Sequence, residues 1–171
     1  MPGQLSRNPL GSVKGAMRSF PQDGGCLCGD LRYSLGEDPV TLYACHCTDC
    51  QRQTGSSFAL SMIVRRTALR LVQGQAREFS VKLADGRTKG GFFCNRCVTK
   101  LWGDSRIANL AVLDPGTLDD TSWVRPVGHI WTHSAQSWVK FEADVLVYSG
   151  APREEGVLAL VRAWKAGTQP P

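Results

Sequence analysis

The sequence lacks both a long apolar run and a large excess of charge of one sign. Its 171 residues are 42% hydrophobic and 20% charged, with a formal net charge of +5. No segment approaches the roughly 20 consecutive apolar residues of a membrane-spanning helix, so a soluble, single-core protein is expected. No long basic extension is present to supply phosphate contacts, so nucleic acid is not a predicted partner.

A recognisable secretory signal is also lacking. Residues 1–22 are rich in Gly, Pro, Ser and Arg, without a continuous apolar stretch. We expect this segment to be a flexible extension, or to precede a true start at Met17. The predicted organisation is therefore an extension over 1–22, one domain over 23–150, and a C-terminal helix and tail over 151–171.

Seven cysteines are present, an odd number that disfavours a complete disulfide framework. They fall into three tight groups along the chain: Cys26 and Cys28; Cys45, Cys47 and Cys50; Cys94 and Cys97. Thiols two or three residues apart chelate one metal ion more readily than they bridge each other. The pattern predicts zinc binding in a reducing compartment, which we expect to be the cytoplasm.

The two outer pairs together supply the four thiolates of a closed tetrahedral zinc site. Glycines flank the first pair in Gly24-Gly25-Cys26-Leu27-Cys28-Gly29, which lets the backbone bend around an ion. The second pair lies in Phe93-Cys94-Asn95-Arg96-Cys97, a knuckle-like sequence. Such a site is predicted to be structural, stabilising the fold by on the order of 10 kcal/mol.

The middle group is predicted to differ in chemistry. Three sulfurs within Cys45-His46-Cys47-Thr48-Asp49-Cys50 can hold zinc and leave the fourth position open. Such a centre is a weak Lewis acid that can still bind and ionise a thiol such as glutathione.

Two alternatives stay open for this group. A protein side chain can complete a purely structural site, and the candidates are His46, Asp49, His129 and His133, although His46 is expected to point away from the metal. The three thiols can also form a metal-free redox cluster.

Short apolar segments interrupted by Gly, Pro, Asp and Asn predict a mainly β fold. The expected strands are Leu31–Leu35, Val40–Ala44, Phe58–Val64, Leu69–Val72, Arg77–Val81, Gly91–Phe93 and Ile107–Leu113. Only the C-terminal segment shows a helical period, in which Val157, Leu160, Val161 and Trp164 recur. One face of that helix is expected to pack on the sheet.

The motifs in combination resemble the glutathione-dependent formaldehyde-activating enzyme family, which includes centromere protein V. The resemblance covers about residues 24–148. It is carried by Gly-Gly-Cys-x-Cys-Gly at 24–29, Cys-His-Cys-x-x-Cys at 45–50 followed by Gly55 and Phe58, Phe-Cys-x-x-Cys at 93–97, Gly-Thr-Leu-Asp-Asp at 116–120 and His-Ile-Trp at 129–131.

This resemblance implies an Mss4-like fold of stacked antiparallel β-sheets stapled by zinc, with a short C-terminal helix. It implies a structural zinc on Cys26, Cys28, Cys94 and Cys97, and a catalytic zinc on Cys45, Cys47 and Cys50. The implied activity is that of a carbon–sulfur lyase, which reversibly joins formaldehyde to the thiol of glutathione. A small-molecule thiol and an aldehyde are therefore the predicted partners, while the sequence predicts no oligomeric state.

Two positions depart from the family pattern. Val98 stands where Gly usually follows the second knuckle cysteine, and a β-branched residue there is expected to distort the turn. Gln51 precedes Arg52, whereas arginine usually follows the central triplet directly. Arg52 is the predicted contact of a glutathione carboxylate, with an ordinary surface arginine as the alternative.

Several other residues have two interpretations. Phe58, Trp102 and Trp131 can wall a pocket or belong to the core. Asp119 and Asp120 are expected in a turn, and His129 is a satisfied histidine or a partner of the zinc loop. At the level of the whole chain, the alternative to a lyase is a zinc-stabilised binding or carrier module without catalysis.

Overall fold

The computed structural model describes residues 19–105 and 107–168. Within them, the strands are β1 (Gln22–Gly25), β2 (Arg32–Leu35), β3 (Thr41–Cys45), β4 (Ala59–Arg65), β5 (Leu69–Gln73), β6 (Ala76–Lys82), β7 (Thr88–Cys94), β8 (Lys100–Asp104), β9 (Leu110–Leu113), β10 (Gly128–Ile130) and β11 (Leu146–Val147). The α-helices are α1 (Thr48–Thr54) and α2 (Glu154–Thr168), and the 3-10 turns are η1 (Arg66–Ala68), η2 (Pro115–Thr117) and η3 (Thr132–Ser134).

The strands form two sheets, ordered β1-β2-β5 and β11-β10-β3-β4-β9-β8-β7-β6. Pairing is antiparallel except around β10, which runs parallel to both β3 and β11. This arrangement confirms the predicted mainly β fold of two sheets with a C-terminal helix. It also places β3, which ends at Cys45, in the interior of the larger sheet.

The two sheets share one hydrophobic core. Tyr33 and Leu35 of the small sheet are fully buried, as are Leu42 and Met62 of the large sheet. Cys26 and Cys94 belong to the same buried cluster. The predicted outer cysteine site is therefore part of the core packing and is not an appendage to it.

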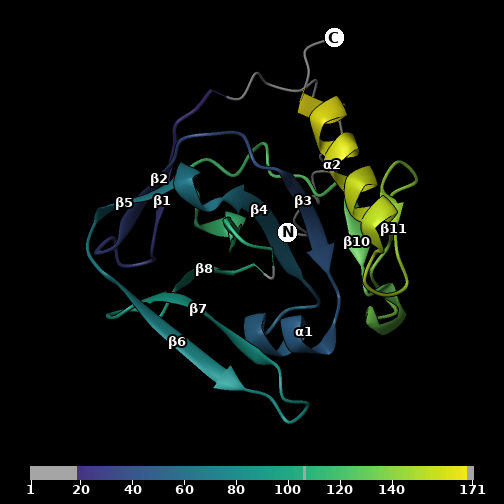
Figure 1. Cartoon of the computed structure of the whole chain (residues 1–171), viewed down its shortest axis with the longest axis horizontal. Helices are drawn as coiled ribbons and strands as arrows, with labels where there is room; N and C mark the ends of the chain where they lie inside the picture. Colours follow the sequence, from purple (N-terminus) through teal and green to yellow (C-terminus); the bar gives the residue numbers. More distant parts are fainter. Residues whose placement is uncertain (1–18, 106, 169–171) are drawn as a thin grey trace, which may run out of the picture.

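Helix α2 packs its apolar face beside β3, as Figure 1 shows. Leu160 and Trp164 are almost completely buried, which confirms the predicted orientation of this helix. Thr41 at the start of β3 donates a hydrogen bond from Oγ1 to the carbonyl of Leu160 at 3.0 Å. The helix thereby supports the strand that leads to Cys45.

Every predicted strand overlaps an observed one, but β1, β8, β10, β11 and α1 were not predicted. The expectation that only the C-terminal end is helical was wrong. Helix α1 has the sequence TDCQRQT, which contains no apolar period. It forms because the Cys47 sulfur caps its first turn and Gly55 ends it in the left-handed region at φ 64°.

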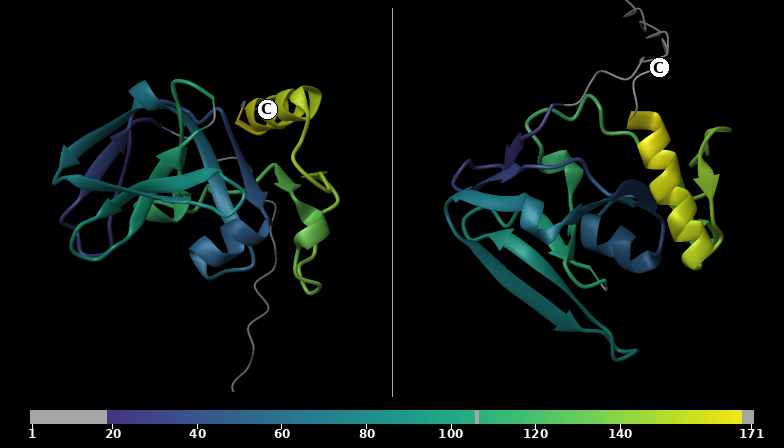
Figure 2. Two further views of the ribbon diagram at one scale, coloured as in Figure 1. Left: turned by 60° about the horizontal axis from the view of Figure 1, so that its bottom comes forward. Right: turned by 45° about the horizontal axis from the view of Figure 1, so that its top comes forward.

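Strands β6 and β7 form a long hairpin that projects from the rest of the large sheet beside α1 (Figures 1 and 2). β6 is the last strand of that sheet. An ion pair of 3.0 Å between Arg87 and Asp49 joins the hairpin to α1. The hairpin is therefore held over the helix that carries Cys50.

At the N-terminal end of the described residues, the Phe20 ring packs edge-on against Trp123, and β1 begins at Gln22. Residues 1–18, including Met17, lie outside the described residues. None of the described helices combines the length and the apolar character that crossing a membrane requires.

Candidate metal centres

The first group of sulfurs joins two segments that lie far apart in the sequence. The Sγ atoms of Cys26, Cys28, Cys94 and Cys97 all lie within 4.8 Å of one another. Two of these separations are 3.5 Å and 3.7 Å. Zinc–sulfur bonds of about 2.3 Å in a tetrahedron separate the sulfurs by roughly 3.8 Å, so the four residues fit a zinc ion.

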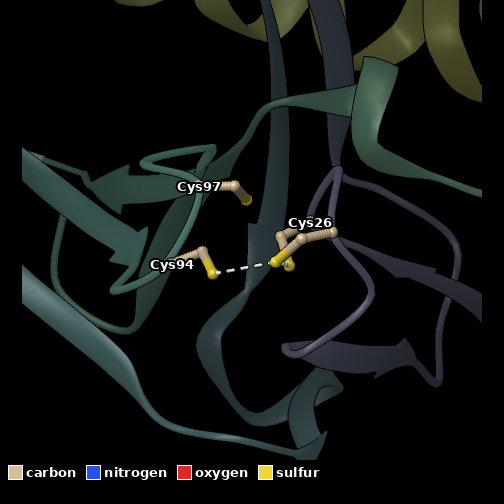
Figure 3. Close-up of side chains that lie close together, drawn as sticks. Cys26, Cys94 and Cys97 are labelled. Atoms are coloured by element: carbon tan, nitrogen blue, oxygen red, sulfur yellow. Dashed lines mark hydrogen bonds between the residues drawn. The ribbon is translucent and has the colours of Figure 1, made fainter.

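Two loops supply these ligands from opposite sides. Figure 3 shows Cys94, the last residue of β7, and Cys97, on the turn between β7 and β8, pointing toward Cys26 on the loop between β1 and β2. Backbone N–H groups of Leu31 and Arg96 donate to the sulfurs of Cys26 and Cys94 at 3.3 and 3.4 Å. These donors favour the thiolate form that a metal requires.

The turn itself is strained at Val98. This residue has φ 59° and is 71% exposed. A β-branched side chain is unfavourable in this left-handed region, so Val98 takes the conformation that glycine favours at a cost in backbone strain. Next to it, hydrogen bonds from Thr99 lower the pKa of Cys97 to about 5.

The second group lies where β3 passes into α1. Cys45 is the last residue of β3, Cys47 is the N-cap of α1, and Cys50 lies in its first turn. Their three sulfurs lie within 4.8 Å of one another. A strand end followed immediately by a helix start therefore turns all three side chains toward one point, which fits a metal ion held on one side.

No fourth protein ligand joins this group among the described residues. Asp49 pairs with Arg87, and His133 Nδ1 lies 2.6 Å from the carbonyl oxygen of Ser149. His46 and His129 contact each other, with 2.9 Å between Nε2 and Nδ1. None of the four candidate ligands thus completes the site, and His46 points away from the sulfurs as predicted.

The two histidines form a buried support behind the cysteine loop. His46 is 0% and His129 7% exposed, and the rings of Phe58 and Phe141 pack against them. Burial lowers the pKa of both imidazoles. A neutral pair that shares one hydrogen bond fills the space beneath the loop without adding charge to it.

Lys89 of β7 brings a positive charge to the central sulfurs. Its Nζ atom donates to Cys50 Sγ at 3.7 Å. The hydrogen bond from Cys45, together with the Lys89 ammonium, lowers the pKa of Cys50 to about 6. The same hydrogen bond raises the pKa of Cys45, so negative charge in the group is concentrated on Cys50.

Gln51 ties the cysteine loop to the segment after β10. Its Nε2 atom donates to the carbonyl oxygens of His46 and Ser134 at 2.7 and 2.8 Å. Ser134 Oγ donates to the same His46 carbonyl at 2.9 Å. The residue that departs from the family pattern therefore has a structural role, because it holds the cysteine loop against the segment after β10.

A pocket of about 620 Å³ opens between α1 and the β6–β7 hairpin. Arg52, the predicted carboxylate contact, lines it, as do Asp49 and Lys89. Lys89 therefore borders both the pocket and Cys50. The three sulfurs of the central group do not themselves line the pocket, but this shared side chain connects the two.

None of the aromatic residues proposed as pocket walls from sequence lines this pocket, but Phe58 lines a second, smaller one of about 400 Å³. Trp102 is 1% exposed and stacks on Phe92 within the core. Trp131 packs against His133, and Phe58 against His46. The aromatic residues that do line the pocket are Phe79 and Phe93. Only the pairing of β6 with β7 brings them together, and no motif in the sequence marks them.

Comparison with known proteins agrees with this geometry. Residues 21–134 match the family model described as glutathione-dependent formaldehyde-activating enzyme. The chain belongs to this family. The matched residues include all seven cysteines, whereas β11 and α2 lie beyond them.

Other comparisons add little detail. No curated protein matches the chain. Among solved structures, a Rhodobacter sphaeroides protein solved as a structural genomics target is similar, with 19% identity and a TM-score of 0.45. The similarity covers 57% of this chain and 87% of that one.

Proposed function

We propose that this protein is a zinc-dependent carbon–sulfur lyase that reversibly joins glutathione, or a similar thiol, to formaldehyde or a related aldehyde. One observation carries the proposal. Cys45, Cys47 and Cys50 form a three-sulfur group that no other described side chain completes. Membership of the formaldehyde-activating family supports the same chemistry.

In this proposal the three central cysteines hold the reactive zinc, and Cys26, Cys28, Cys94 and Cys97 hold a structural one. A zinc ion with three thiolate ligands supplies the affinity for a fourth thiol and the charge that ionises it. In the reaction the thiol sulfur attacks the aldehyde carbon, a C–S bond forms, the C=O π bond breaks, and the proton of the thiol ends on the carbonyl oxygen. No electrons are gained or lost overall.

The chain's own residues bind and orient the reactants. The Lys89 ammonium beside Cys50 is positioned to stabilise negative charge that develops on the aldehyde oxygen near the sulfur. Arg52 at the pocket margin is the proposed partner of a glutathione carboxylate. Holding both reactants in one pocket contributes proximity, which is the larger part of what catalysis requires for this facile addition.

Metal content and thiol binding test the proposal directly. Zinc per chain is measured before and after mild chelation, and glutathione binding is measured by calorimetry on each sample. Two zinc ions, one of them labile, and glutathione binding that disappears with the labile ion are the expected results. One tight zinc without thiol binding, even after metal is restored, would indicate a zinc-stabilised binding module instead.

A further inference from the structure

The outer strand of the large sheet presents apolar side chains where a polar surface is expected. In β6, Phe79 and Val81 lie on the same face as Arg77, and Glu78, Ser80 and Lys82 lie on the other. Yet Phe79 is 59% and Val81 51% exposed. Edge strands usually carry charges or prolines on such faces, because exposed apolar edges promote aggregation. An apolar face retained here indicates a ligand.

The apolar face of β6 lines the pocket beside α1. Phe79, Val81 and Leu83 contribute from the hairpin, and Phe93 and Val98 from β7 and the knuckle turn. The Phe79 and Phe93 rings meet edge-to-face at 6.4 Å. These five side chains form the apolar wall of the pocket, and the pocket volume of about 620 Å³ far exceeds what a molecule as small as formaldehyde fills.

The charged side chains of the pocket leave it with an excess of positive charge. Arg52 and Arg77 line it and make no ion pair within the described part of the chain. Asp49, the acidic residue of the lining, is already paired with Arg87. The pocket therefore offers uncompensated positive charge next to an apolar wall. An amphipathic anion complements both features.

Strand register places these features relative to the sulfurs. Val81 lies opposite Lys89, and Phe79 lies opposite Gly91, in the β6–β7 pairing. Lys89 contacts Cys50 Sγ, so Val81 adjoins the residue that borders the central group. A sulfur held at that group would therefore lie near Lys89, which lines the same pocket as the apolar side chains.

From this arrangement we infer that the pocket binds thiol adducts of apolar aldehydes: an anionic thiol whose sulfur carries an alkyl or aryl group larger than hydroxymethyl. The inference rests on the proposed lyase activity and adds its substrate class. The reaction balances as for formaldehyde, with a C–S bond formed at the aldehyde carbon and the thiol proton transferred to oxygen. The alkyl or aryl group of the aldehyde packs on Phe79 and Val81.

Stable thioethers test the pocket separately from the chemistry. Binding of S-hexylglutathione and S-methylglutathione to the full chain is measured by calorimetry. A thioether has no proton to lose, so its binding does not depend on thiol ionisation. We expect the hexyl compound to bind about tenfold more tightly, because its additional methylenes are removed from water. Equal affinities would overturn the inference.

A matched pair of variants locates the effect. Val81 and Val72 are both 51% exposed, but Val72 lies on β5 outside the pocket lining. Val81→Ser is expected to reduce the preference for the hexyl compound about threefold or more, and Val72→Ser to leave it unchanged. Equal losses in both variants would contradict a specific pocket. A dimer in light scattering that Val81→Ser dissociates, without a hexyl preference, would assign the wall to a second copy and overturn the inference.

Failure of this inference and failure of the proposed function give different results. If formaldehyde and glutathione combine at the central group but the hexyl preference is missing, only the substrate class is wrong. If the hexyl preference is present and no adduct forms with either formaldehyde or 3-phenylpropanal, the pocket is correct and the lyase activity is wrong. Faster adduct formation with 3-phenylpropanal than with formaldehyde, relative to the uncatalysed rates, is the result expected when both are correct.

Discussion

The two cysteine groups use the same ligand in different surroundings. The outer group has four sulfurs from two loops far apart in the chain, and Cys26 and Cys94 are part of the hydrophobic core. The central group has three sulfurs from a single strand-to-helix junction, and Lys89, which contacts Cys50, lines a pocket that Cys94 of the outer group also lines. A site that joins distant segments stabilises the fold, whereas a local site can lose its metal while the surrounding structure persists. The two groups therefore differ in where their ligands come from and not in ligand type, which is the basis of the different roles proposed for them.

The largest predicted effect comes from breaking the outer group. Cys94→Ser removes a buried ligand from the crosslink between the β1–β2 loop and the β7–β8 turn. We expect the free energy of unfolding to fall by several kcal/mol, up to the roughly 10 kcal/mol of a structural zinc site. Circular dichroism and zinc content check this. A variant that retains its native melting temperature would show that the outer group is not structural.

Cys50→Ser breaks the central group and should reduce activity much more than stability. The fold and one zinc per chain are expected to be retained, while adduct formation falls by about 100-fold or more because one of three thiolates is lost. Melting temperature, zinc content and adduct formation by NMR are measured on the same preparation. Unfolding comparable to that of Cys94→Ser would remove the distinction between the two groups.

The support of the central group can be tested at Gln51. Gln51→Met retains the volume of the side chain but removes three hydrogen bonds: the two that Nε2 donates to His46 and Ser134, and a longer one that Oε1 accepts from Gln136. The expected loss of stability is about 2 kcal/mol, together with weaker binding of the labile zinc in a competitive chelator titration. Gln53→Met, on the exposed side of the same helix, is the control and should change neither quantity.

Strain in the outer group can be relieved at Val98. Val98→Gly places at φ 59° the residue that favours this conformation. Glycine removes the strain of the left-handed conformation, but it also increases the conformational entropy of the unfolded chain. The first effect is the larger, so we expect the free energy of unfolding to rise by roughly 1 kcal/mol. Denaturant unfolding measures the change. A decrease would mean that the Val98 side chain contributes more by its contacts than its backbone costs.

The smallest predicted effect concerns an ion pair next to the outer group. Arg32 of β2 donates to both oxygens of Asp119, one at 2.9 Å, and lowers the pKa of that carboxyl group. A carboxyl with a lowered pKa in the folded state stabilises the fold above its ordinary pKa of about 4, and this contribution disappears as the pH falls through the lowered value.

Both side chains are partly exposed, so Asp119→Asn should cost less than about 1 kcal/mol at pH 7. The difference from the unsubstituted chain should vanish in strongly acidic solution. Urea unfolding at several pH values measures it. A difference that stays constant with pH would attribute the effect to packing and not to charge.

The spacing of the cysteines was enough to predict three local clusters, because thiols two or three residues apart in a chain are necessarily close in space. That the two outer pairs form one group was predicted from the four ligands of a closed zinc site, and the fold brings them together. The apolar segments likewise predicted most of the strands and the packing face of α2. Helix α1 could not be predicted in this way, since its sequence has no apolar period and its ends are set by a sulfur cap and a left-handed glycine. Phe58, Trp102 and Trp131 were candidates for the pocket because of their residue type alone.

The sequence by itself thus determined which residues can bind metal and the family to which the chain belongs, since both depend on local spacing. Only the tertiary structure decided that His46, Asp49, His129 and His133 stay outside the central group. It also decided that Lys89 contacts Cys50 and lines the same pocket as Phe79 and Phe93. These contacts depend on strand register and on the path of the β6–β7 hairpin. Register is set by the packing of the whole sheet, which no short motif encodes.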